Sequence, residues 1–217
     1  MSRMKDMSYE IRSSMNVIMG LAESYLENDT LTDEVRDGFE KIYNEGGMLL
    51  RSINRVLDPS GAAEGDTGEK AQNFTFKNAA QTKRKKVIRE PMPYGRVLIV
   101  DDMVSNLDVA KLLLKPYQLQ IDCAGSGLDA INKIKSGKEY DIVFMDHMMP
   151  EMDGMETTKK LRQSGYKLPI IALTANTAEG QSELFLANGF DAFISKPIDI
   201  RQLNDSLNKF VRDKKRI

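Results

Sequence analysis

The sequence predicts an α/β protein, in which a parallel sheet of five strands with helices on both faces follows an all-α helical hairpin. Two observations predict the sheet. Five apolar segments alternate with helix-like segments between residues 96 and 215, and runs such as VLIV and PIIAL are apolar throughout. Strands buried on both faces show this continuous pattern. A third observation, apolar residues at helical spacing before residue 58, predicts the hairpin.

The first region, residues 1–58, is predicted to form two long helices. Apolar residues recur at steps of three and four, which places them on one helical face. They are Met4, Met7, Ile11, Met15, Ile18, Ala22 and Tyr25 in the first helix and, with Gly46 on the same stripe, Val35, Phe39, Ile42, Leu49, Ile53 and Val56 in the second. The polar link ENDTLTDE offers Thr30 and Asp33 at capping-box spacing.

Two helices cannot close a core between them, because each apolar stripe covers only part of the other. We therefore expect a homodimer through residues 1–58 that forms a four-helix bundle. The alternative is that the hairpin packs against the rest of its own chain.

Residues 59–95 are predicted to be a linker. The stretch DPSGAAEGDTGEK, which begins at the end of the hairpin, is polar and glycine-rich and shows no periodicity. QNFTFKN is compatible with one isolated strand. The basic cluster at 83–86 indicates either an acidic or nucleic-acid partner or a solvated surface, and we favour the solvated surface for one short cluster.

The last region, residues 96–215, alternates strands and helices in order. The first pairs are RVLIVDD with SNLDVAKLLLKPY, and LQIDCAG with GLDAINKIKSG. YDIVFMD is followed by METTKKLRQSG, LPIIALTA by AEGQSELFLANG, and FDAFISK by IRQLNDSLNKFVRDKK. Repeats of this kind predict a parallel sheet with crossover helices.

Composition narrows the class of protein. Charged residues make up 29% of the chain and apolar residues 41%, which is typical of a soluble globular protein. The net charge of −1 predicts no nucleic-acid partner and no attraction to acidic membranes. One cysteine excludes an internal disulfide, and no apolar run approaches the ~20 residues needed to span a bilayer. We expect a cytoplasmic protein without membrane contact.

Polar residues close the predicted strands. Asp101 and Asp102 follow the first strand, Asp146 ends the third, Thr174 the fourth, and Lys196 follows the fifth. In open α/β sheets the active crevice lies at the carboxyl ends of the strands. Three carboxylates there would repel one another, and a hard divalent cation such as Mg²⁺ relieves that repulsion. Such a site suits an anionic phosphoryl group arriving on a carboxylate.

These motifs resemble the receiver domain of two-component response regulators. They are VDD at 100–102, MDHMMPEMDG around Asp146, LTA at 173–175 and KP at 196–197. The resemblance implies a doubly wound, flavodoxin-like fold over 96–215 and Mg²⁺ as the cofactor. It also implies a histidine kinase or a histidine phosphotransfer protein as the partner that donates phosphate.

Carried over residue by residue, the resemblance assigns a role to each strand end. It implies that Asp146 accepts the phosphoryl group and that Thr174 and Lys196 bind its oxygens. The implied Mg²⁺ ligands are Asp101, Asp102, Asp146 and the backbone carbonyl of Met148. Phe193 matches the switch aromatic of the family, although a plain core residue would look the same in sequence.

His147 is the only histidine of the chain and follows Asp146 directly. A histidine beside a carboxylate suggests a metal ligand or a general base. Zinc would require several nitrogen or sulfur ligands, which the sequence does not supply nearby. We therefore interpret His147 as a bystander.

The first helix resembles that of the dimerisation and phosphotransfer hairpin of sensor histidine kinases. Glu10, Ile11, Arg12, Met15 and Asn16 match that pattern, but Tyr9 stands where the phospho-accepting histidine belongs. A phenol with a pKa of about 10 would form a stable ester and not a high-energy phosphoramidate. Tyr9 is therefore predicted to be a degenerate phosphodonor position.

The resemblance as a whole is to a hybrid sensor kinase without an ATP-binding domain between its hairpin and its receiver. We therefore do not expect this chain to phosphorylate other proteins. One hypothesis is a phosphorelay receiver with a dimerising hairpin. The other is a non-catalytic scaffold or phosphate sink that pairs with an intact sensor kinase through the hairpin.

Overall fold

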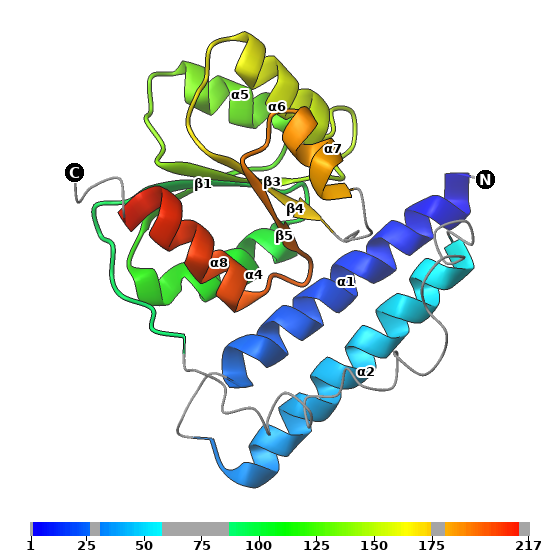
Figure 1. The fold of residues 1–217 in the computed structure, drawn as a ribbon. Helices are drawn as coiled ribbons and strands as arrows, with labels where there is room; N and C mark the ends of the chain where they lie inside the picture. Colours follow the sequence, from blue (N-terminus) through cyan, green and yellow to red (C-terminus); the bar gives the residue numbers. More distant parts are fainter. Residues whose placement is uncertain (1, 27–30, 58–86, 175–180, 213–217) are drawn as a thin grey trace. The chain divides into compact units, whose positions relative to one another are not determined.

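The computed structural model describes residues 2–26, 31–57, 87–174 and 181–212, with the side chains of residues 2–10, 51, 54–57 and 181–182 outside that description (Figure 1). The chain forms two compact units, residues 1–86 and 87–217. The predicted isolated strand QNFTFKN and the basic cluster at 83–86 both lie outside the described residues.

The first unit contains the predicted helical hairpin, with α1 at Ser2–Leu26 and α2 at Asp33–Leu57. Its two helices meet closely at Gly46, where an added Cβ would lie 2.8 Å from Met19 Cγ. Near the turn, the rings of Tyr25 and Phe39 stack with centroids 4.9 Å apart. The start of α2 is tied to the end of α1, because Arg36 Nη1 donates a hydrogen bond to the Leu26 carbonyl at 2.7 Å.

The N-terminus of α2 has two acidic residues, Asp33 and Glu34, in its first turn. Negative charge there interacts favourably with the helix dipole. The Arg36 amide donates to the Thr32 carbonyl at 2.9 Å. Thr30, the first residue of the predicted capping box, lies outside the described residues.

Apolar side chains of the described hairpin remain exposed to solvent. Each of the following is more than a third exposed: Ile11, Ile18, Leu21, Tyr25, Val35, Ile42, Met48 and Leu49. Single exposed apolar residues are normal on protein surfaces, but a group of this size on two adjacent helices indicates a surface that is covered in the working protein.

Within the described residues of the second unit, five parallel strands form one sheet in the order β2-β1-β3-β4-β5. The predicted doubly wound, flavodoxin-like fold is confirmed. The strands are β1 (Arg96–Val100), β2 (Gln120–Ala124), β3 (Ile142–Asp146), β4 (Ile170–Thr174) and β5 (Ala192–Ser195). Every residue of β3 and β4 is buried, which explains why these strands are apolar almost without interruption.

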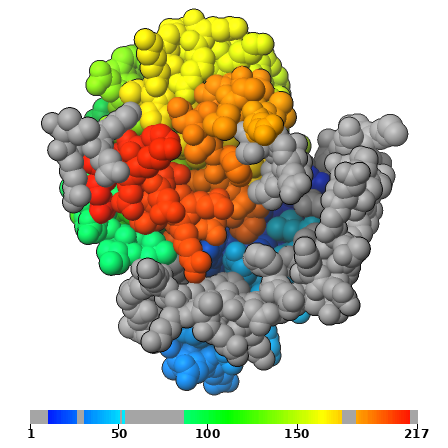
Figure 2. All heavy atoms as spheres, viewed as in Figure 1, coloured from blue at the N-terminus to red at the C-terminus, as the bar shows by residue number. Residues whose placement is uncertain are grey.

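Helices cover both faces of this sheet. As Figure 1 shows, α5, α6 and α7 lie on one face and α4 and α8 on the other. The helices are α4 (Val104–Leu114) with its short extension η2 (Lys115–Tyr117), α5 (Gly127–Lys135), α6 (Gly154–Gln163), α7 (Gln181–Ala187) and α8 (Ile200–Leu207), which continues as the π-helical turn η3 (Asn208–Arg212). In the space-filling view, α7 and α8 form neighbouring parts of one surface of this unit (Figure 2).

Side-chain caps fix where three of these helices begin. Ser126, Asp153 and Asp199 precede α5, α6 and α8, and each accepts a hydrogen bond from a backbone amide of the first turn. An N-cap of this type stabilises a helix by about 1 kcal/mol.

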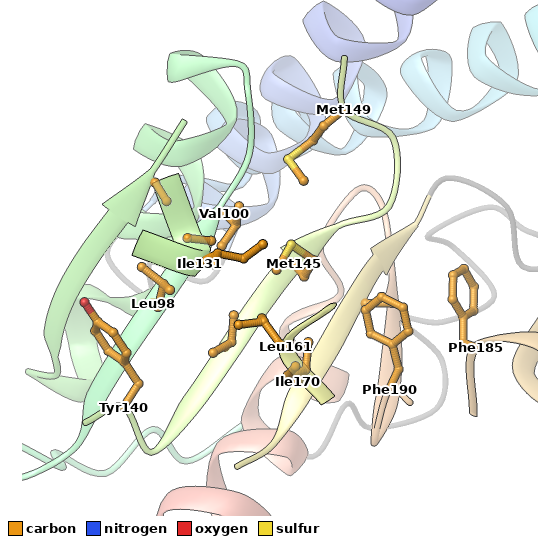
Figure 3. Close-up of a cluster of buried hydrophobic side chains, with 14 residues drawn as sticks. Leu98, Val100, Ile131, Tyr140, Met145, Met149, Leu161, Ile170, Phe185 and Phe190 are labelled. Atoms are coloured by element: carbon orange, nitrogen blue, oxygen red, sulfur yellow. The ribbon is translucent and has the colours of Figure 1, made fainter. Parts of the chain in front are cut away.

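The core on the α5–α6–α7 face is built from aliphatic and aromatic side chains (Figure 3). Leu98 and Val100 of β1 and Met145 of β3 point into it, together with Leu161 of α6 and Phe185 of α7. Burial of this apolar surface is the main force that holds the crossover helices on the sheet.

Residues 87–95, which we call the lead-in segment, pack on the second unit before β1 begins. Met92 is completely buried, and its amide donates to the Tyr117 carbonyl at 2.6 Å. Glu90 forms an ion pair with Arg212 of η3. At Gly95 an added Cβ would lie 2.7 Å from Leu119 Cδ2, so the backbone passes too close for a side chain.

Candidate functional site

The carboxyl ends of the strands bring three acidic residues together. Asp101, Asp102 and Asp146 each offer one carboxylate oxygen, and these three oxygens lie within 4.8 Å of one another. Asp101 and Asp146 are buried, and Asp102 is half-buried. The prediction that these residues gather at one edge of the sheet is confirmed.

Lys196 enters the same cluster from the end of β5. Its Nζ lies 2.6 Å from Asp101 Oδ2 and 2.8 Å from Asp146 Oδ1. Its side chain is only 8% exposed. Burial opposes the charged form of Lys196, but attraction by Asp146 and Asp101 outweighs it and raises the lysine pKa. The ammonium therefore stays charged between the two carboxylates.

The cluster is nevertheless short of positive charge. Burial raises the pKa of Asp146 to about 6, Lys196 opposes that rise, and the neighbouring Asp101 adds to it. Three carboxylates face one ammonium here. A divalent cation would supply the missing positive charge and would favour the ionised form of Asp146.

The donor set of this cluster fits Mg²⁺. Mg²⁺ binds oxygen ligands at about 2.1 Å, so oxygens on opposite sides of one ion lie about 4.2 Å apart. The three oxygens lie within 4.8 Å of one another, which is close to that spacing. All three donors are carboxylates, the type of ligand that Mg²⁺ prefers.

Asp101 is held in place by its surroundings on three sides. Its backbone amide donates to the Ala124 carbonyl at 3.1 Å. Its Oδ1 accepts hydrogen bonds from the Met103 amide and from Asn106 Nδ2, both at 2.9 Å. Asn106 is not among the site residues predicted from the sequence. A signal existed, because Asn106 lies in the first turn of the helix that follows the Asp101–Asp102 pair.

The loop after Asp146 returns so that its backbone lies close to that residue. Gly154 donates from its amide to the His147 carbonyl at 3.0 Å, and an added Cβ at Gly154 would lie 2.1 Å from the Asp146 carbonyl oxygen. The glycine of the MDG motif is therefore required by close backbone approach. The Met148 amide lies 3.4 Å from Asp146 Oδ1, at the long end of a hydrogen bond.

His147 packs on Phe185. Their rings meet edge to face, with centroids 5.1 Å apart and planes at 88°. Burial lowers the pKa of His147 below its usual value, which favours the neutral ring. This aromatic packing agrees with its interpretation as a bystander to metal binding.

Thr174 is buried at the end of β4, and its carbonyl accepts a hydrogen bond from the Lys196 amide at 2.7 Å. Phe193 of β5 is half-buried and stacks on Phe185, with centroids 6.2 Å apart. Thr174 thus lies beside the cluster, and Phe193 lies on the neighbouring strand. Tyr9 belongs to α1, but its side chain is outside the described part of the structure.

The fold and the acidic cluster define the receiver class of signalling domain. The family model for the response regulator receiver domain matches residues 97–208, and the chain belongs to this family. Residues 3–65 match the His Kinase A (phospho-acceptor) domain. The chain therefore combines a histidine-kinase-type hairpin with a receiver, and it is a component of two-component signalling.

Solved structures support the receiver fold. The receiver domain of the Francisella response regulator 1452 is 27% identical, covers 55% of this chain with 98% of its own length, and has a TM-score of 0.52. The receiver domain of the Saccharomyces cerevisiae response regulator Ssk1, solved with the histidine phosphotransfer protein Ypd1, is 25% identical, with a TM-score of 0.51 and coverage of 55% of this chain and 90% of that one.

Curated relatives are histidine kinases. Histidine kinase 3 of Arabidopsis thaliana is 34% identical over 146 residues, which is 57% of this chain and 14% of that protein. The autoinducer 2 sensor kinase/phosphatase LuxQ of Vibrio parahaemolyticus is 30% identical over 186 residues, 77% of this chain and 21% of that protein. The chain thus spans less than a quarter of each of these two relatives. Among the described residues, no helix has the length and apolarity needed to cross a membrane.

Proposed function

We propose that this chain is a phosphorelay receiver in which Asp146 accepts a phosphoryl group from the phosphohistidine of a partner kinase or phosphotransfer protein. One observation supports this most: Lys196 Nζ lies within 2.8 Å of both Asp101 and Asp146 in a cluster whose other described members are acidic. A buried carboxylate beside a fixed ammonium, with further carboxylates able to bind a cation, matches the needs of an acyl phosphate.

In the transfer, an Asp146 carboxylate oxygen attacks phosphorus and a new oxygen–phosphorus bond forms. The phosphorus–nitrogen bond to the donor imidazole breaks, and its electron pair returns to the nitrogen, which takes a proton from solvent. Bound Mg²⁺ would neutralise charge on the phosphoryl oxygens. Asp101, Asp102, Asp146 and the Met148 carbonyl would hold it.

Two further side chains would stabilise the product. The Lys196 ammonium, already 2.8 Å from Asp146 Oδ1, would pair with a phosphoryl oxygen. The Thr174 hydroxyl would donate to another, and Phe193 would turn inward as Thr174 shifts. These roles rest on the position of Thr174 at the end of β4, on that of Phe193 within the adjacent strand β5, and on the family resemblance.

The hairpin would make the protein a dimer. Its exposed apolar side chains, including Ile18 and Ile42 at 44% and 45% exposure, provide the surface for a four-helix bundle of two chains. Tyr9, in the place of the donor histidine, would leave the hairpin without a phosphate to give to Asp146.

The acceptor is tested by incubation with acetyl phosphate and Mg²⁺, followed by intact-mass measurement. The wild type should gain one phosphoryl group, Asp146→Ala should gain none, and Asp108→Ala, which removes an exposed carboxylate on α4, should behave as the wild type. An unmodified wild type, or equal modification of Asp146→Ala, would defeat the proposal.

The exposed apolar surface of the hairpin also favours a second candidate function, a scaffold or phosphate sink that pairs with an intact sensor kinase. Subunit exchange between differently tagged copies of this chain and a histidine kinase hairpin separates the two functions. Mixed dimers would support the scaffold, and homodimers alone would count against it.

A further inference from the structure

Asp101 divides its two carboxylate oxygens between different kinds of partner. Oδ1 accepts two hydrogen bonds from neutral donors, the Met103 amide and Asn106 Nδ2, both at 2.9 Å. Oδ2 faces the charged centre of the cluster and lies 2.6 Å from Lys196 Nζ. Two donors occupy both lone pairs of Oδ1, so the oxygen that remains for a cation is Oδ2.

The two donors to Oδ1 differ in origin. The Met103 amide lies two residues from Asp101 and follows from the local turn. Asn106 donates from its side chain in the first turn of α4. The local turn does not require an asparagine at this position. Without Asn106, Asp101 Oδ1 would keep only the Met103 donor, and the carboxylate would be less restrained about its terminal torsion, which is broad in carboxylic side chains.

We propose that Asn106 is a positioning residue that fixes the Asp101 carboxylate and reserves its Oδ2 for the divalent cation of the site. This inference rests on the proposed function, because it requires a cation at the acidic cluster. Partners that orient metal ligands through a hydrogen bond typically change metal affinity by about 10- to 100-fold when they are removed.

The test is calorimetric titration of Mg²⁺ into the full chain, which does not depend on phosphorylation. Asn106→Leu keeps the branched shape of the side chain and removes the donor, and Asn106→Ala removes both the branch and the donor. We expect the Mg²⁺ dissociation constant to rise about 10-fold in both variants. The matched control is Asp108→Ala on the same helix, an exposed carboxylate paired with Lys111, which should leave the constant within about 2-fold.

A second measurement separates positioning from a purely structural role. The rate of phosphorylation by acetyl phosphate is followed as Mg²⁺ is increased. A positioning role predicts that the Mg²⁺ concentration for half-maximal rate rises about 10-fold while the rate at saturating Mg²⁺ stays within about 2-fold of the wild type.

Each outcome distinguishes the hypotheses. Unchanged Mg²⁺ affinity in Asn106→Leu and Asn106→Ala, with tight binding in the wild type, would overturn this inference and leave the proposed function intact. A wild type that binds no Mg²⁺ would overturn both. Loss of folding in both variants would assign Asn106 a structural role and would overturn the inference.

Discussion

At the scale of single residues, Lys196 has two opposing effects on the site. It neutralises part of the charge on Asp101 and Asp146, with contacts of 2.6 and 2.8 Å, and it contacts Asp101 Oδ2, the oxygen that we propose for the cation. A buried charge that loses its partner is strongly destabilising. The lysine therefore stabilises the metal-free protein, and under the proposed function it would compete with the cation.

Lys196→Met tests both effects. The variant should unfold at lower urea concentration than the wild type in EDTA, because two buried carboxylates lose their counter-charge; the cost is about 3 kcal/mol. Saturating Mg²⁺ should then stabilise the variant by more than it stabilises the wild type. Paired urea titrations with EDTA and with Mg²⁺ measure this difference. An equal Mg²⁺ effect in the two proteins would show that Lys196 does not compete.

The contribution of the buried Tyr140 phenol to the free energy of unfolding should depend on pH. Tyr140 is 1% exposed, and its hydroxyl donates to Asp122 Oδ2 at 3.0 Å. Burial, reinforced by the hydrogen bond to Asp122, raises its pKa to about 12. The unfolded value is about 10. Because the folded pKa is higher, this group's contribution to stability is complete below pH 10 and is lost as the pH rises toward 12.

Tyr140→Phe should therefore cost about 1.5 kcal/mol of unfolding free energy at pH 8, the worth of a hydrogen bond to a charged group. At pH 11 the difference between wild type and variant should shrink by about 1 kcal/mol, because the unfolded wild type ionises there. Urea unfolding at both pH values measures it, with Tyr94→Phe at a 43% exposed tyrosine as the control. A difference that is equal at pH 8 and pH 11 would contradict the assignment.

At the scale of elements, Arg162 joins three segments of the receiver. From α6 its Nε donates to the Gly189 carbonyl at 2.8 Å, and its Nη2 lies 2.7 Å from Asp191 Oδ2. Its Nη1 donates to the carbonyls of Tyr166 and Leu168 in the loop before β4. One guanidinium thus fixes the end of α6, that loop and the turn between α7 and β5.

Arg162→Lys keeps the charge and loses the planar fork of donors, so the two loops lose most of their connection. We expect a loss of about 2 kcal/mol in unfolding free energy. The urea midpoint reports it. Lys160→Ala, which removes an exposed i,i+4 pair with Glu156, should cost less than about 0.5 kcal/mol. Equal midpoints for Arg162→Lys and the wild type would refute the role.

The elements and the acidic cluster could be predicted from sequence because both follow from repeated patterns. Apolar runs gave the strands, and the first polar residue after each run gave Asp101, Asp146 and Thr174. The hydrogen bonds of the Arg162 guanidinium and the hydrogen bond from Asn106 to Asp101 could not be predicted in the same way. Each involves a single side chain that reaches distant backbone or a neighbouring carboxylate, and such contacts leave no period in the sequence.

At the scale of the whole molecule, the exposed apolar side chains of the hairpin bear on how many chains associate in solution. The hairpin buries Met19 and Ala22 but leaves Ile18, Ile42 and Leu49 between 44% and 48% exposed. A four-helix bundle made by two hairpins would cover such side chains. The protein is therefore expected to have twice the 24.5 kDa mass of one chain in solution.

The double change Ile18→Glu and Ile42→Glu should convert this dimer to a monomer, since burying two carboxylates without partners is costly. Light scattering after size-exclusion chromatography gives the mass. Leu186→Glu, at a 54% exposed position of α7 in the other unit, is the matched control and should remain dimeric. A monomeric wild type would rule out the bundle.

The lead-in segment has a consequence for access to Asp146. Its buried anchor, Met92, and the close approach at Gly95 lie before β1, whereas Asp101 follows the last residue of that strand. Five residues of extended chain separate the two edges by about 16 Å. Residues 87–95 are thus held at the opposite edge of the sheet from Asp101, and under the proposed function a partner's phosphohistidine would approach Asp146 without meeting them.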